Sequence, residues 1–291
     1  MKLIVTASND TIFSLLDKAI DGIILPIKNH AMRFGETFDL NDLPSYIKQA
    51  HQKNKQLFVA VNAIYHEDKL DDLAETMMTL STLAIDGIYF ADLAVYEFAQ
   101  SYGLKDKLIY YPETYVTNYQ DMAFWASEQI KSAVLSREMT LEDIEAISKN
   151  SPLSVSIIGH GYLNMFHSKR RLIKTFFDYT KHKQKTDLTN QTYKIIEEIR
   201  DEAYPIYQDQ FGTHIFREKP LASIRVFESL TPYVDNFIID TQFYQNDVIY
   251  DVIDDYVALK AGHSIDASKY DDHDDGFYYK KTVYKQGGGA V

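Results

Sequence analysis

The 291-residue chain contains no cysteine. This absence excludes disulfides, zinc sites with thiolate ligands, iron–sulfur clusters held by the chain's own side chains, and a thiol nucleophile. Glycine and proline are few, at 12 and 7 residues, and hydrophobic residues make up 45% of the chain. These proportions are ordinary for a globular, enzyme-like protein and exclude a fibrous or disordered one.

Long hydrophobic runs are also missing. The longest, such as residues 22–27, are far shorter than the roughly 20 residues that a membrane-spanning helix needs. The first residues, MKLIVTAS, hold only a short apolar run, whereas a signal peptide has an apolar region of about 7–15 residues before a small-residue cleavage site. We therefore expect a cytoplasmic chain without a membrane segment.

Positive charge is scarce, because the formal net charge is −12. A charge of this sign opposes nonspecific attraction to nucleic acid. Residues 169–185 are the exception, with seven lysines and arginines against one acid, Asp178. Since salt screens charges beyond about 8 Å, this segment can attract phosphate despite the charge of the whole chain.

Short β-rich segments alternate with longer helical segments, which is typical of βα units around a parallel sheet. The predicted strands span residues 3–7, 22–26, 56–62, 87–91, 107–113, 132–137, 153–160 and 236–240. The predicted helices span residues 10–20, 41–53, 70–83, 94–102, 119–129, 141–149, 221–230 and 246–261. This pattern predicts an α/β fold, a TIM-like (β/α)8 barrel in one domain at residues 1–262. An open, doubly wound sheet is the alternative.

An insertion follows the seventh predicted strand and covers residues 162–220. It begins with a basic helix at 169–182 and continues with two extended stretches, 193–200 and 204–217. Gly212 provides the turn residue expected between paired strands. The insertion is therefore predicted to be a helix followed by a β-hairpin.

A C-terminal tail is predicted at residues 263–291. Its acidic cluster, residues 271–275, could contact a divalent cation, because carboxylates suit hard ions. We favour the simpler interpretation, a solvated acidic tail.

Polar residues stand where the predicted strands end. In a TIM-like barrel the functional site lies at the C-terminal ends of the strands, so these residues are the candidates. They are Asn62 and His66 after the third strand, Glu113 after the fifth, Arg137 and Glu138 after the sixth, His160 ending the seventh and Asp240 ending the eighth.

The polar residues at these strand ends could support two kinds of chemistry. Arg33 and Arg137 could bind an anionic small molecule, and His160, Glu113 or Glu138 could act as acid or base in catalysis. His160 is expected to face the barrel mouth. The alternative is structural: Arg137 would pair with Glu113 and Glu138 in an ion-pair network that caps the barrel.

Motifs of several well-known sites are absent. There is no HExxH, and His66 lacks a second histidine four residues later, so the sequence predicts no metal site. Neither GxGxxG nor GxxxxGK[ST] occurs, and GxSxG is missing too. Phosphate-loop nucleotide binding and a serine nucleophile elbow therefore have no support.

The basic helix of the insertion invites an RNA-binding interpretation. Phe166, Phe176, Phe177 and Tyr179 lie among its lysines and arginines and could stack on bases. Alternatively, residues at helical spacing form a packing face and the lysines are its solvated side. The residues of that face are Leu172, Ile173, Phe176 and Phe177.

Several segments together resemble the peptidase U32 family, and especially its short, cysteine-poor branch that pairs with a longer U32 protein. The similarity covers most of residues 1–260. The matching segments are Val61–Ala63, His66–Lys69, Tyr111–Thr114, Asn118, Ala133–Glu138, Ile158–Gly161, Met165–Arg170, Glu197–Arg200, Tyr204–Pro205 and Asp209–Phe216.

The resemblance implies a barrel fold and, for many members, an iron–sulfur cluster held by four cysteines. Asn164 and Arg171 stand near positions where such members have cysteine after the His-Gly pair. Neither side chain can replace a thiolate ligand. The chain is therefore expected to hold no cofactor, while a longer U32 partner carries the cluster.

The resemblance also implies a function. The short branch resembles a subunit of the prephenate-dependent system that forms 5-hydroxyuridine at the wobble position of tRNA, with prephenate as co-substrate. Other members are named as collagenase-like proteases, so a hydrolase of the U32 peptidase type is one alternative, and a non-catalytic scaffold is another. Beyond Asn62, His66, Arg33 and Asp240, the expected substrate contacts are Asn118, Ser168, Lys169, Arg170 and Arg200.

Overall fold

The computed structural model describes residues 1–8, 11–181, 193–196 and 202–279. Its centre consists of eight parallel strands: β1 (Lys2–Thr6), β2 (Gly22–Pro26), β3 (Gln56–Val61), β4 (Gly87–Phe90), β5 (Leu108–Tyr110), β6 (Ser132–Val134), β7 (Ser154–Gly161) and β13 (Asn236–Ile239). They pair in the order β7, β13, β1, β2, β3, β4, β5, β6, and β6 pairs again with β7. The sheet is closed, so the predicted TIM-like barrel is confirmed and the open doubly wound sheet is wrong.

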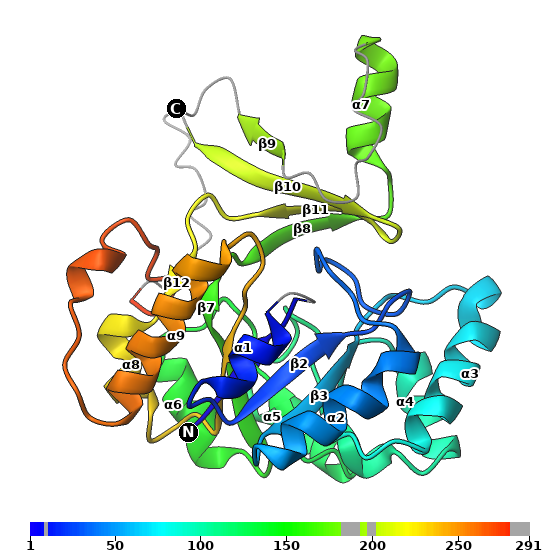
Figure 1. Ribbon diagram of the computed structural model, residues 1–291, viewed down its shortest axis with the longest axis horizontal. Helices are drawn as coiled ribbons and strands as arrows, with labels where there is room; N and C mark the ends of the chain where they lie inside the picture. The colour runs from blue at the N-terminus through cyan, green and yellow to red at the C-terminus, as the bar shows by residue number, and fades with distance from the viewer. Residues whose placement is uncertain (9–10, 182–192, 197–201, 280–291) are drawn as a thin grey trace, which may run out of the picture.

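Helices surround the barrel (Figure 1). They are α1 (Ile12–Asp17), α2 (Leu43–Gln52), α3 (Leu70–Ser81), α4 (Leu93–Ser101), α5 (Tyr119–Ser127), α6 (Leu141–Asn150), α8 (Phe227–Leu230) and α9 (Asn246–Lys260). Polar caps set where several begin. The Thr140 hydroxyl accepts the N–H of Asp143 at the start of α6, and Asn118 caps α5 in the same way, which satisfies N–H groups that have no partner within the helix.

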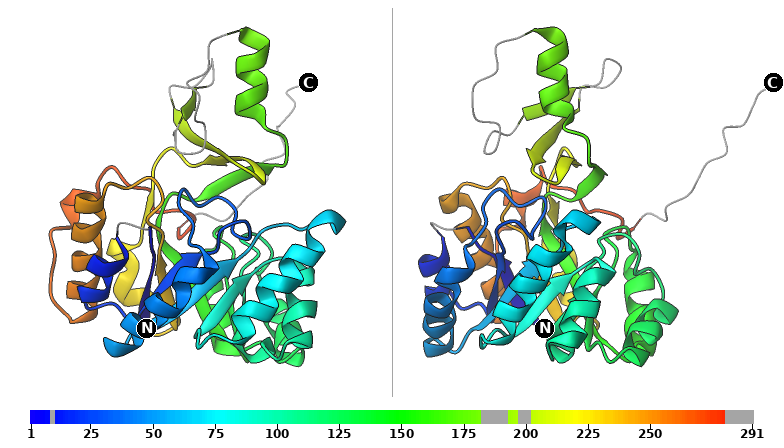
Figure 2. Two further views of the ribbon diagram at one scale, coloured as in Figure 1. Left: turned by 45° about the vertical axis from the view of Figure 1, so that its right-hand side comes forward. Right: turned by 90° about the vertical axis from the view of Figure 1, so that its right-hand side faces the viewer.

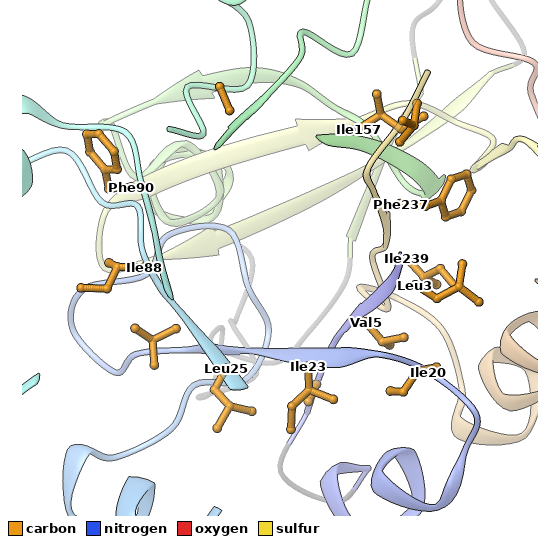
Figure 3. Packing of buried hydrophobic residues seen from close by; sticks show 14 of the residues in the cluster. Leu3, Val5, Ile20, Ile23, Leu25, Ile88, Phe90, Ile157, Phe237 and Ile239 are labelled. Atoms are coloured by element: carbon orange, nitrogen blue, oxygen red, sulfur yellow. The ribbon is translucent and has the colours of Figure 1, made fainter. Parts of the chain in front are cut away.

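Alternate residues along each strand face two different cores, as the period-2 geometry of a strand requires. Outward-facing side chains such as Val5, Ile23 and Ile239 pack beneath the helices (Figure 3). Inward-facing ones such as Ile4 and Tyr89 fill the barrel. The described part of the barrel interior is therefore packed with side chains.

The insertion forms a four-stranded antiparallel sheet in the order β8, β11, β10, β9. Its elements are β8 (Asn164–Ser168), α7 (Leu172–Thr180), β9 (Tyr193–Ile196), β10 (Ala203–Asp209) and β11 (Gly212–Phe216). The sheet covers the C-terminal end of the barrel, and α7 projects away from it (Figures 1 and 2). We call this sheet the roof sheet. The predicted helix and hairpin are confirmed, and β8 and β9 complete a larger sheet than was expected.

Two contacts tie the roof sheet to the barrel. The Tyr207 hydroxyl donates to the carbonyl oxygen of Phe34 at 3.1 Å, and the N–H of Arg33 donates to the Asp209 carboxylate at 2.7 Å. The same carboxylate receives a hydrogen bond from His214 at 3.0 Å. The roof sheet is thus fixed to the loop that follows β2.

Residues 263–279 pack against the barrel. The N–H of Ala222, in the short strand β12 (Leu221–Ala222), donates to the carbonyl oxygen of Asp274 at 3.0 Å, and the Asp274 carboxylate pairs with Arg217. Tyr270 and Tyr278 are buried. The interpretation of the acidic cluster as a solvated tail is therefore wrong for Asp274, because two buried tyrosines and an ion pair anchor this segment.

Within the described part of the chain, every helix is too short or too polar to cross a membrane.

Candidate functional site

A buried ion-pair cluster closes the centre of the barrel mouth. Arg33 donates from Nε to Glu113, from Nη1 to Asp240 at 2.9 Å and from Nη2 to the hydroxyl of Tyr111. Arg137 donates from Nη1 to the second oxygen of Glu113 at 2.8 Å. The four charged side chains are between 3% and 11% exposed. The predicted pairing of Arg137 with Glu113 is confirmed, whereas Glu138 is exposed and lies outside this cluster.

The backbone places two members of the cluster in an uncommon conformation. Arg33 and Glu113 have φ values of 69° and 67°, in the left-handed region that side chains other than glycine rarely adopt. Such backbone strain is typical of functional sites. Both residues lie in loops that follow strands, Arg33 after β2 and Glu113 after β5, and their side chains meet in the cluster.

The charges of the cluster balance one another. Burial opposes ionisation of Glu113, but the guanidinium groups of Arg33 and Arg137 outweigh it and hold the pKa of Glu113 below its usual value. Burial likewise disfavours the charge on Arg33, yet neighbouring Glu113 and Asp240 raise its pKa. All three guanidinium nitrogens of Arg33 are already bonded within the protein. The side chain of Arg33 is also only 3% exposed, so the cluster leaves little of it accessible to a substrate anion.

His160 lies outside this cluster. Its ring is fully buried, with Nδ1 3.2 Å from the hydroxyl of Tyr256 and Nε2 2.8 Å from that of Tyr244. The expectation that it faces the barrel mouth is wrong, because the pairing of β7 with β13 slips by one residue between Ile158 and His160. A bulge of this kind reverses the side-chain alternation, so His160 points outward to α9.

Acidification is expected to destabilise the protein through His160. Burial, reinforced by nearby His273, lowers the pKa of His160 to about 3, whereas an unfolded histidine titrates near 6.5. The unfolded state binds more protons between these values, so stability falls as the pH drops below about 6.5. At pH 5 the contribution is at most about 2 kcal/mol. Denaturant unfolding of the wild type at pH 7.5 and pH 5 measures this loss in the free energy of unfolding. The variant His160→Asn should lose less unfolding free energy over the same pH change. Equal losses in the two proteins would contradict the role of His160.

The other predicted residues are dispersed. Asn62 is buried and its side-chain oxygen accepts the N–H of Met32, so it supports the loop that carries Arg33. Asn118 caps α5, and the Ser168 hydroxyl accepts the N–H of Arg170 at 3.3 Å. These contacts are structural.

Two grooves flank the cluster. His66 and Lys169 line one of about 550 Å³ between the barrel and the β10–β11 turn. Arg137 and Glu138 line the other, of about 520 Å³, which we call the outer groove. Arg200 lies outside the described residues.

A third opening, of about 500 Å³, lies above the ends of β1 and β13 and the start of α9. We call it the barrel-mouth pocket. Of the predicted site residues only Asp240 reaches it. Its walls include aromatic rings and hydroxyl or amide groups, contributed by Thr6, Thr11, Phe34, Tyr207, Thr241, Gln242, Phe243, Tyr244, Gln245 and Asn246. The run of polar and aromatic residues directly after the eighth strand was the sequence signal for this pocket.

The basic segment at the start of α7 is solvent-accessible. Lys169, Arg170, Arg171 and Lys174 are all exposed, and of these Lys174 pairs with Asp178 one helical turn away. The proposed packing face is only partly right. Ile173 is buried and Phe177 contacts Tyr193, but Phe176 is 60% exposed. Tyr179, which was not predicted to belong to this face, is 87% exposed.

Within the described residues, no group of three or more histidine, aspartate or glutamate side chains could hold a metal ion.

The sequence matches the model of a known family, described as peptidase family U32, over residues 8–274. Among curated proteins, tRNA hydroxylation protein P2 of Bacillus subtilis is 28% identical over 303 residues, covering 97% of this chain and 98% of that protein. An uncharacterized protease of Methanocaldococcus jannaschii is 26% identical and covers 93% of this chain and 66% of its own length. tRNA hydroxylation protein P of Escherichia coli is 23% identical over 67% of this chain and 52% of its own length.

The fold has a solved counterpart. The solved structure of a U32 peptidase superposes with a TM-score of 0.51 at 12% sequence identity, covering 84% of this chain and 94% of the other. At this identity the likeness shows the barrel fold alone.

Proposed function

Because the chain belongs to peptidase family U32, and because a tRNA hydroxylation protein matches it over almost the whole length of both, we propose that it is a subunit of a tRNA hydroxylation system. The end-to-end match carries this proposal. Relatives from several other bacteria that match over parts of the chain bear the same kind of name. The proposed task of this subunit is to bind tRNA.

The exposed basic segment supports tRNA binding. Lys169, Arg170 and Arg171 make no ion pair with the described residues, so their charges are free to meet phosphates. Backbone phosphates supply most of the affinity of nucleic-acid complexes. The exposed rings of Phe176 and Tyr179 next to them could stack on unpaired bases. This combination compensates locally for a chain whose net charge is −12.

Redox chemistry must come from elsewhere in the system. Hydroxylating a base removes electrons from it, and a chain with no cysteine offers no thiolate ligands for an iron–sulfur cluster. We propose that a longer U32 partner carries the cluster. The system's co-substrate is proposed to be an anion such as prephenate. In the outer groove, Lys219 and Arg217, whose Nη1 atom is buried without a partner among the described residues, offer cationic contacts for it. The same groove is also lined by the carboxylates of Glu138, Glu202, Glu218 and Asp274.

A peptidase function is the second candidate, because one relative is named as a protease. The geometry gives it little support. The Ser168 hydroxyl bonds to the backbone of Arg170, and Nε2 of His167 lies 3.4 Å from the carbonyl oxygen of Phe211. The two side chains therefore lack the hydrogen bond that activates a serine nucleophile. We expect the purified chain to cleave neither gelatin nor peptides, with or without added divalent metals.

Co-purification tests the proposal. Affinity-tagged chain isolated from cells should bring down tRNA and a longer U32 protein, and iron should follow that partner. The chain expressed alone should contain no iron. Isolation of the chain without tRNA and without a U32 partner would contradict the proposal, while an intact partner complex that contains no tRNA would favour the scaffold alternative.

A further inference from the structure

The barrel-mouth pocket is suited to an uncharged ligand. Among the described residues, its lining has no lysine, arginine or histidine, and the side chains there that carry charge at neutral pH are the carboxylates of Asp240 and Glu36. Asp240 is neutralised by Arg33 on the far side of the carboxylate and also accepts the N–H of Gln242 at 3.1 Å. Among the described residues of the lining an anion would meet no lysine, arginine or histidine, so this part of the wall offers no cationic side chain to attract phosphates or carboxylates.

Fixed aromatic rings form one part of the wall. Phe243 lies edge-on to Phe216, with ring centroids 4.8 Å apart, and contacts Tyr162 at 5.5 Å. Tyr207 is held by its hydrogen bond to Phe34, and Tyr244 by its bond to His160. Since these contacts restrict the rings before any ligand arrives, a flat group could stack on them with little loss of freedom.

Amide groups supply the polar part. The side-chain oxygen of Gln242 accepts the N–H of Gly35 at 2.8 Å, which fixes this amide, while its nitrogen donates to no other described residue. The exposed side chain of Gln245 likewise has no hydrogen-bond partner among the described residues. Amides read the hydrogen-bonding edge of an unpaired base, which has both donors and acceptors.

Taken together, size, charge and lining identify a ligand class. The volume of about 500 Å³ lies within the range of small-molecule sites. We propose that the barrel-mouth pocket receives one uncharged nucleoside unit turned out of the bound tRNA, stacked against Phe243 and contacted by Gln242 and Gln245. Enzymes that modify bases commonly hold the target outside its stack in such a pocket. The proposal rests on the proposed function and adds the substrate subsite.

Two variants of Phe243 separate stacking from packing. Phe243→Tyr keeps the ring and should retain clearly more tRNA hydroxylation than Phe243→Leu when each is expressed in a strain lacking the chromosomal gene. Phe243→Leu keeps an apolar side chain against Phe216 but removes the ring. It should lower the hydroxylated fraction of tRNA roughly 10-fold or more, with the Kd for whole tRNA changed less than about threefold, because phosphate contacts dominate that affinity.

Gln245→Ala is a second test of the pocket in case Phe243→Leu fails to fold, because Gln245 is exposed. Gln245→Ala should also lower the hydroxylated fraction of tRNA. Met78→Ala, on the outer face of α3, is the matched control and should behave as wild type. Full hydroxylation in both Phe243→Leu and Gln245→Ala would overturn the pocket assignment. It would leave the proposed function intact if tRNA binding persists.

Free nucleosides test the pocket without tRNA. In NMR titrations of the full chain with uridine, cytidine, adenosine and guanosine, at least one should shift signals of Phe243 and Tyr244, and Phe243→Leu should weaken its binding roughly 10-fold. The matching 5′-monophosphate should bind no more tightly than the nucleoside. Tighter binding of the monophosphate, or no binding of any nucleoside, would overturn the proposal even if the chain binds tRNA elsewhere.

Discussion

Replacing Arg33 by leucine is expected to lower the free energy of unfolding by about 3–5 kcal/mol. The substitution leaves the carboxylate of Asp240 buried without its cation and Glu113 with one guanidinium instead of two. Removing one member of a buried ion pair is costly because the remaining charge has already left water. Urea denaturation of the wild type and of Arg33→Leu measures the difference.

Arg225→Leu is the control for this experiment. Arg225 pairs with Asp271 at the surface, where the two side chains are 40% and 70% exposed, and such pairs contribute at most about 1 kcal/mol. A loss in Arg33→Leu no larger than the loss in Arg225→Leu would show that the cluster does not hold the barrel mouth together.

The second large effect is expected on tRNA affinity. The triple variant Lys169→Gln, Arg170→Gln, Arg171→Gln removes three exposed positive charges from the start of α7. If each contacts a phosphate, the affinity at low salt should fall roughly 10- to 100-fold, and the slope of log K against log salt should become shallower by about 2–3. Filter binding of tRNA across a salt series gives both quantities.

Any loss of three positive charges could weaken tRNA binding through the net charge of the chain. The control therefore removes three positive charges from a different part of the surface. Lys48, Lys53 and Lys131 are exposed; Lys53 and Lys131 precede β3 and β6, at the end of the barrel opposite the roof sheet. Changing all three to glutamine should leave the affinity within about threefold of the wild type. Equal losses in the two triple variants would argue against a defined tRNA site on α7.

Much of the fold could be predicted from sequence, because its determinants are local. Short apolar runs at regular spacing predict the eight strands, and Gly212 predicts the hairpin turn of the insertion. The anchoring of residues 263–279 was missed, since it depends on the burial of Tyr270 and Tyr278 against distant elements, which no local pattern reports.

The site was predicted less well, for identifiable physical reasons. The pairing of Glu113 with Arg137 could be anticipated from strand ends that converge in a barrel. The orientation of His160 could not, because one bulge in β7 reverses which side chains face inward. The central position of Arg33 depends on a left-handed backbone conformation that only the folded loop imposes.

The most direct test of the central claim is mass spectrometry of tRNA nucleosides from a strain that lacks this gene. We predict that 5-hydroxyuridine disappears from its tRNA, returns with the wild-type gene and stays reduced with the variant that lacks the charges of Lys169, Arg170 and Arg171. An unchanged level of 5-hydroxyuridine in the deletion strain would contradict the assignment of this chain to a tRNA hydroxylation system.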